Sequence, residues 1–163
     1  MKGIQIVLRS THQGEHHLAE ELLAVAERHR TEHEVHRVAI DLAGWSREHV
    51  ARLAKTARGY DVDLDGPPDS SGTGVLGTLR AKTAQALGRR PEPGLLLLRD
   101  LRELHLAASE NSLNWEMLAQ AAQATRDATL LELASSCHPQ TLRQMRWTNT
   151  MIKILSPQVL TSL

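Results

Sequence analysis

The stretch DVDLDGPPDSSGT, residues 61–73, interrupts a sequence that otherwise has mostly helical patterns. Asp, Pro, Ser and Gly make up most of it, and these residues favour turns and loops. Amphipathic patterns occur on both sides of this stretch. We therefore predict a long connection over residues 60–92 in the middle of an all-helical protein, with a short helix of its own near residues 75–88.

Before this connection, apolar residues recur at alternating steps of three and four, which is the pattern of an amphipathic helix. The pattern predicts helices over residues 11–30 and 33–58. Because only a few polar residues separate them, the two helices must fold back as an antiparallel hairpin. Residues 1–10 are either a short N-terminal arm or the first turns of the first helix. The capping-box spacing of Ser10 and Gln13 favours the arm.

After the connection, the same spacing predicts helices over residues 94–124 and 127–155, which form a second hairpin. Asp127 is the expected N-cap of the last helix. Pro157 is expected to follow its end. His138-Pro139 lies inside the pattern, and a proline in a helix interior removes a hydrogen bond and clashes with the preceding turn. We therefore expect a kink or break there.

Composition limits the classes of partner. The 163 residues have a net charge of zero, no phenylalanine and one cysteine, Cys137. This length suits a single domain, residues 1–163, with a core of aliphatic side chains. Dispersed charge and few aromatic rings argue against a nucleic-acid partner. No apolar run is long enough to span a membrane, and no signal-peptide layout is present. We expect a cytoplasmic protein with no membrane partner.

Two hairpins joined by one long crossover resemble the ferritin-like superfamily over residues 10–156, so we expect a ferritin-like four-helix bundle. The di-metal members of that superfamily take one Glu from each of two helices and a Glu-x-x-His pair from each of the other two. Two degenerate copies of this pair occur here, SREH at residues 46–49 and SSCH at residues 135–138. In each copy, serine replaces the glutamate.

The resemblance implies four metal ligands, one from each helix: Glu15, His49, Glu110 and His138. Counted from the end of the bundle that holds the first turn, these residues fall within about 7 Å of one level at helical rise. Asn111 fits the inward stripe better than Glu110. The competing interpretation is that His49 and His138 are core histidines whose hydrogen bonds are made by Ser, Thr or Gln.

The function that we expect depends on the two glutamates that serine replaces in the Glu-x-x-His pairs. Without them, two metal ions in an apolar bundle would lack the negative charge that they require. We therefore expect a non-catalytic binding or structural module that self-associates as a homodimer or larger assembly, with no cofactor and no assigned catalytic residue. The alternative is a metal-binding oxidoreductase or metal-storage protein that uses iron or manganese. One divalent ion, Fe, Mn or Zn, is electrostatically allowed.

Other histidine spacings suggest simpler explanations. The i, i+4 pairs His12/His16 and His29/His33 could chelate zinc, but we expect them to lie on solvated helix faces instead. His17 and Glu21 resemble one piece of a haemerythrin pattern. The last two long helices carry only His105 and His138, so the rest of that site cannot be assembled.

Three further features have structural explanations. Residues 72–77 match G-x-G-x-x-G, but the preceding residues do not form the buried strand that a dinucleotide fingerprint needs. Cys137 lies on the inward stripe and is expected to be a small buried filler rather than a nucleophile. Trp45, Trp115 and Trp147 lie within helical patterns and are expected to be core or interface side chains.

Overall fold

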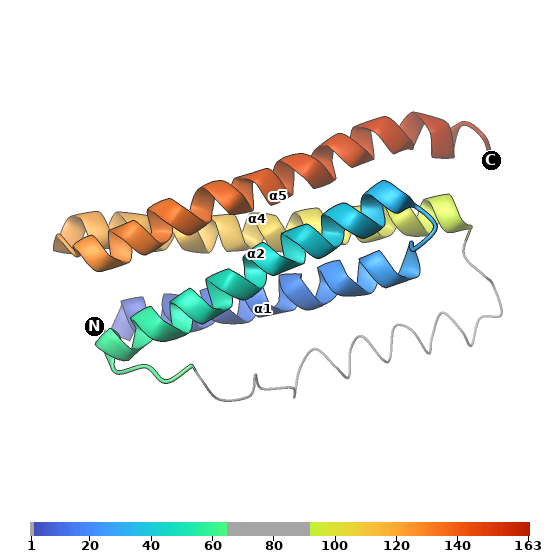
Figure 1. The fold of residues 1–163 in the computed structure, drawn as a ribbon. Coiled ribbons are helices and arrows are strands. Elements are labelled where there is room, and N and C mark those ends of the chain that lie inside the picture. The colour runs from blue at the N-terminus through green and yellow to red at the C-terminus, as the bar shows by residue number, and fades with distance from the viewer. Residues whose placement is uncertain (1, 65–91) are drawn as a thin grey trace.

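The computed structural model describes residues 2–64 and 92–163. In these ranges the protein is an all-α four-helix bundle made of two hairpins (Figure 1). No β-strand occurs in them. The long helices are α1 (Lys2–Arg28), α2 (His33–Ala57), α4 (Pro93–Thr125) and α5 (Ala128–Leu160), and a short 3-10 turn, η1 (Arg58–Tyr60), follows α2.

Local sequence signals fix the ends of the second hairpin. Glu92 caps α4, because its side chain accepts a hydrogen bond of 2.9 Å from the Leu95 backbone N–H. Arg126 has a left-handed backbone with φ of 54°, which ends α4 and reverses the chain. Asp127 then accepts a bond of 3.0 Å from the Leu130 N–H, which confirms its predicted role as the N-cap of α5.

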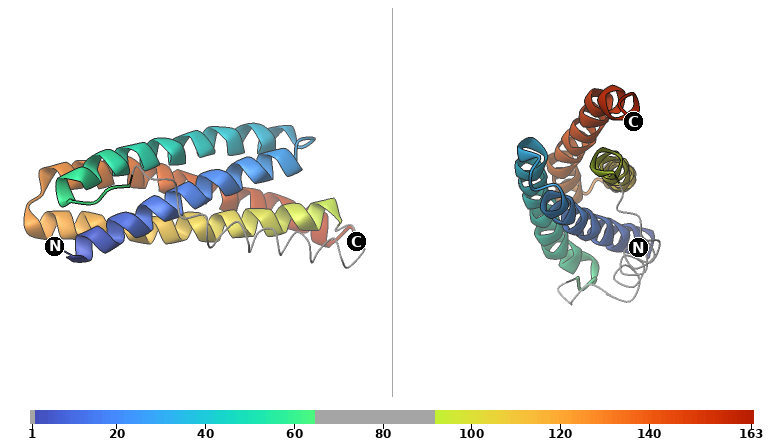
Figure 2. Two further views of the ribbon diagram at one scale, coloured as in Figure 1. Left: turned by 90° about the horizontal axis from the view of Figure 1, so that it is seen from below. Right: turned by 90° about the vertical axis from the view of Figure 1, so that its right-hand side faces the viewer.

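The helices alternate in direction around the bundle. α1 and α5 run one way, and α2 and α4 run the other (Figure 1). α1 packs against both α2 and α4, and α5 packs mainly against α4 and less extensively against α2. The position of α1 beside both α2 and α4 is visible from below in Figure 2. The long connection therefore joins two helices that run in the same direction.

Among the residues that the structure describes, the core consists of two apolar clusters separated by polar side chains. One cluster includes Leu18, Leu42 and Leu101, and the other includes Leu8, Leu53 and Leu118. On each helix, polar residues lie between the positions that contribute to the two clusters. We call this set the central polar layer, and its members are at most 1% exposed: Glu15, Ser46, His49, Asn111, Thr141 and Gln144.

The predicted N-terminal arm is wrong, because α1 begins at Lys2. Ile4 and Leu8 are 7% and 0% exposed and belong to the core, and the side chain of Thr11 bonds the carbonyl of Val7. Because burial of these apolar side chains stabilises the first turns, the helix runs through Ser10 and Gln13. The prediction had started the helix at these capping-box residues. The one-domain expectation for residues 1–163 stays a prediction.

α5 also differs from its prediction, because it continues through Pro139 and past Pro157 to Leu160. Pro139 is exposed, while Cys137 and Thr141 on either side of it are fully buried. Packing of the buried face thus holds the helix together across one missing backbone hydrogen bond. Pro157 lies in the last turn, where interrupting the helix has little effect.

Two predicted features, the short helix near residues 75–88 and the glycine motif at residues 72–77, lie outside the described residues. None of the described helices combines the length and the apolar character needed to cross a membrane.

Candidate functional site

The centre of the bundle holds two of the four predicted ligands, Glu15 on α1 and His49 on α2. Both side chains are completely buried, and Nδ1 of His49 lies 3.1 Å from Oε1 of Glu15. The indole N–H of Trp115 donates to the same oxygen at 2.8 Å, and the Thr141 hydroxyl lies 3.5 Å from it. The carboxylate is therefore held from three other helices: α2, α4 and α5.

His49 uses both of its ring nitrogens. Nε2 lies 2.7 Å from the amide oxygen of Gln140, which can only accept a hydrogen bond, so this nitrogen carries a proton. Nδ1 faces the Glu15 carboxylate. Burial by itself lowers the pKa of His49, but hydrogen bonds and charge interactions with Cys137 and Glu15 outweigh it and raise the pKa to about 10. With this pKa, we expect His49 to be a positively charged imidazolium at neutral pH.

The ring of His49 is also held by an aromatic contact. The His49 and Trp115 rings meet edge to face, with centroids 5.8 Å apart and planes at 81°. Trp115 therefore contacts both members of the pair, since it also donates to Glu15. Side chains from all four long helices therefore surround the ion pair.

The remaining members of the central polar layer are less completely bonded. The Gln144 amide donates to the Ser46 hydroxyl at 2.9 Å and to the Leu42 carbonyl at 3.0 Å. Within the described part of the chain, six buried side-chain atoms have no hydrogen-bond partner: Oε2 of Glu15, Nδ1 of His49, Oδ1 and Nδ2 of Asn111, Oε1 of Gln144 and Nε1 of Trp147. Such atoms lower stability, because they lose their hydration on folding. The contact of Nδ1 of His49 with Glu15 is an ion pair at 3.1 Å.

Gly14 explains how the Asn111 side chain fits into the layer. A Cβ atom at Gly14 would overlap Oδ1 of Asn111, so α1 has no side chain where α4 approaches it. This close approach brings the amide into the bundle, where it is completely buried. Asn111, rather than its neighbour Glu110, is therefore the inward residue of α4 at this level.

The other two predicted ligands lie away from the pair. Glu110 is exposed on the outer side of α4. His138 is 18% exposed in the seam between α4 and α5, where Nε2 lies 2.8 Å from the Ser112 hydroxyl and Nδ1 lies 3.8 Å from Glu116. Among residues 2–64 and 92–163, no group of three or more His, Cys, Asp or Glu is arranged to hold a metal ion.

The position of His138 follows from that of Cys137. Adjacent residues on a helix point about 100° apart, and Cys137 is completely buried against the bundle centre. Its neighbour is therefore turned toward the surface seam. The burial agrees with the prediction that Cys137 is a small core residue, and its influence on the pKa of His49 was not predicted.

A second buried cluster joins the end of α1 to the start of α4. Asp100 is 4% exposed and lies 2.7 Å from Nε2 of His29, and the Arg28 guanidinium donates two bonds to it at 3.0 and 3.2 Å. His29 is thus engaged with Asp100, while His33 is exposed. Of the other predicted zinc pair, His12 is 8% exposed and His16 is partly exposed. The expectation of a solvated helix face is therefore wrong for His12 and His29, which are buried.

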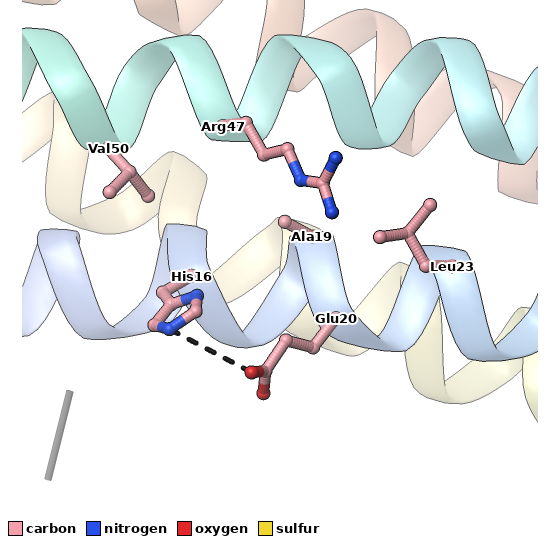
Figure 3. Close-up of a pocket in the computed structure, with 6 residues that line it drawn as sticks. All are labelled: His16, Ala19, Glu20, Leu23, Arg47 and Val50. Atoms are coloured by element: carbon pink, nitrogen blue, oxygen red, sulfur yellow. Dashed lines mark ion pairs between the residues drawn. The ribbon is translucent and has the colours of Figure 1, made fainter. Parts of the chain in front are cut away.

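A shallow groove lies between α1 and α2 (Figure 3). Its volume is about 240 Å³, below the range of about 300–1,000 Å³ for small-molecule sites, and its lining residues are His16, Ala19, Glu20, Leu23, Arg47 and Val50. Figure 3 shows Arg47 extending from α2 toward α1, near Ala19 and Leu23. The His16–Glu20 pair is 3.8 Å apart and partly solvated, so the groove has no buried polar anchor.

Sequence reasoning missed the residues that hold the ion pair, Trp115 and Gln140. A signal existed for the polar layer itself, because Asn111, Thr141 and Gln144 occupy inward positions of apolar stripes. No sequence pattern shows that Gln140 would reach His49 across the bundle. Comparison with known proteins found no family model, no curated protein and no solved structure that matches the chain.

Proposed function

We propose that the protein is a ferritin-like bundle that acts as a non-catalytic binding or structural module and self-associates. The observation that carries this proposal is the buried ion pair between Glu15 and His49. It occupies the level of the bundle at which the resemblance implied a metal centre. In this proposal the pair neutralises its own charge and needs no cation.

The chemistry of His49 supports this proposal. A histidine binds a metal through the lone pair of a neutral imidazole. In His49 one nitrogen donates to Gln140 and the other faces Glu15, with the pKa raised to about 10. An imidazolium has no free lone pair, so the donor set does not fit a di-metal centre.

The serine positions support the same interpretation. Ser46 stands where the Glu-x-x-His pattern has a glutamate, and it is completely buried in the central polar layer. Its hydroxyl accepts a hydrogen bond from Gln144. The site of a missing carboxylate is thus filled by a neutral hydrogen-bonded pair, while the second such serine, Ser135, is exposed.

The directions of the helices support the ferritin-like part of the proposal. A connection between two helices that run the same way distinguishes one-crossover bundles from up-and-down bundles with only short loops. α2 and α4 have this relation in Figure 1.

Metal analysis of protein purified without chelators tests the proposed function. We expect less than about one transition-metal ion per chain, and no oxidation of added Fe(II) above the rate of the His49→Ala variant, because the carboxylates that iron chemistry needs are missing. About two iron or manganese ions per chain, lost in His49→Ala, would contradict this proposal. The metal-dependent oxidoreductase would then be the better proposal.

A further inference from the structure

The outer face of α4 carries large apolar side chains that the bundle does not cover. They are Leu95, Leu106, Leu113 and Met117, between 41% and 66% exposed, and we call them the α4 outer stripe. At 100° per residue they lie within about 40° of one another around the helix. The opposite face of α4 is already buried against α1 and α5, so this helix is apolar on two sides.

Charged residues flank the α4 outer stripe in an ordered way. Arg99 and Arg102, 61% and 70% exposed, lie toward the N-terminal end of α4. Glu116 lies toward its C-terminal end and Glu110 lies at the middle of the helix, and both are exposed. Two copies of this face that met in parallel would place like charges together, whereas antiparallel copies bring basic and acidic ends together.

Two of the four stripe residues are symmetric about one point, whereas Leu95 and Met117 fall opposite Ala124 and Arg102 in a register centred there. Leu106 and Leu113 are equally distant from a midpoint between residues 109 and 110, and Arg102 and Glu116 are centred within half a residue of the same point. Arg99 and Gln120 share this midpoint. An antiparallel pairing with this register therefore places leucine on leucine and arginine beside glutamate at once. Such self-complementarity is what a twofold interface requires.

We propose that a second copy of this chain docks antiparallel on the α4 outer stripe, with a twofold axis between residues 109 and 110. Each Leu106 packs on the partner's Leu113, and each Arg102 lies beside the partner's Glu116. This inference rests on the self-association in the proposed function, and it identifies the surface through which the two copies associate. The exposed apolar patch is then the buried centre of a dimer interface.

Cysteine cross-linking tests the register. Residue 110 lies about 1.5 Å along the axis from its own copy, whereas residue 103 lies about 20 Å from its copy, at 1.5 Å per residue. We expect Glu110→Cys to give a covalent dimer with a short thiol cross-linker, and the matched variant Glu103→Cys to remain monomeric on a denaturing gel. The native Cys137 is completely buried and provides the unmodified control.

Charge reversal tests the pairing in solution. Sedimentation equilibrium should show a dimer that Leu113→Glu weakens at least about 100-fold and Arg102→Glu weakens about tenfold. The double variant Arg102→Glu/Glu116→Arg should recover most of the second loss. Leu142→Glu, at a comparably exposed leucine of α5, should leave the dimer intact.

Each contrary outcome identifies the part that fails. A dimer that survives Leu113→Glu but dissociates in Leu142→Glu would overturn the α4 interface and leave self-association standing. A double variant no better than Arg102→Glu alone, or equal cross-linking at residues 103 and 110, would overturn the antiparallel register. A monomer at every concentration would overturn both this interface and the self-association on which it rests.

Discussion

Glu15 and His49 show how a single buried charge depends on its partner. Each side chain is completely enclosed, so neither can be solvated by water when the other is removed. Trp115 and Gln140 supply hydrogen bonds, but neither supplies a compensating charge. The pair is therefore expected to behave as one unit in any substitution.

A double-mutant cycle measures this dependence. Glu15→Leu and His49→Leu should each lower the free energy of unfolding by about 3–5 kcal/mol, because each leaves a buried charge unpaired. The double variant should be less destabilised than the sum of the two changes. Chemical denaturation of the four proteins checks this, and additive losses would mean that the two side chains do not interact.

The raised pKa of His49 also predicts how stability depends on pH. The ordinary pKa is 6.5 and the pKa in the folded protein is about 10, so the folded state binds this proton more tightly. The resulting stabilisation is fully present below about pH 6.5 and is lost as the pH rises through about 10. Between about pH 6.5 and 10, the thermal unfolding midpoint of the wild type should therefore fall with rising pH more steeply than that of His49→Gln. Parallel curves of midpoint against pH would contradict the raised pKa.

At the residue scale, the sequence predicted the level of a residue along the bundle better than the direction in which its side chain points. Counting residues from the hairpin turns placed Glu15 and His49 at one level, and the structure places them in contact. The same counting could not choose between Glu110 and Asn111, or between Cys137 and His138. Neighbours on a helix differ by about 100° in direction, and only packing against the other helices decides which one faces inward.

At the scale of the helices, apolar periodicity predicted the middle of each element well and the ends less well. The predicted helix over residues 33–58 agrees with α2 to within a residue, and that over 94–124 agrees with α4 equally well. α1 and α5 are longer than predicted because core packing outweighs local signals, the capping box at Ser10 and the prolines at positions 139 and 157. Local propensity is thus the weaker influence in this bundle.

The inward stripe of α2 can be tested by comparing two aliphatic residues. Leu42 is 5% exposed and Ile40 is 42% exposed, although they lie two positions apart. Leu42→Ala should lower the free energy of unfolding by about 2–5 kcal/mol, because it opens a cavity in a packed core. Ile40→Ala should change it by less than about 1 kcal/mol. Equal losses in denaturant unfolding would show that the stripe is assigned to the wrong face.

At the scale of the whole molecule, the two-hairpin architecture followed from loop lengths, since short links force neighbouring helices to be antiparallel. The central polar layer divides the core into two apolar clusters, and this division could not be predicted from the sequence. It depends on which residues of the four helices lie at the same height along the bundle. The proposed function rests on this layer. In this layer, Glu15 and His49 form a buried ion pair in the middle of the bundle.

The protonation state of His49 tests this central claim most directly. The nitrogen resonances of its imidazole ring, measured by NMR at about pH 8, distinguish a charged ring from a neutral one. A histidine of ordinary pKa would be neutral there. Our account predicts two protonated ring nitrogens, held by Glu15 and Gln140. One unprotonated ring nitrogen at this pH, free or bound to a metal ion, would contradict it.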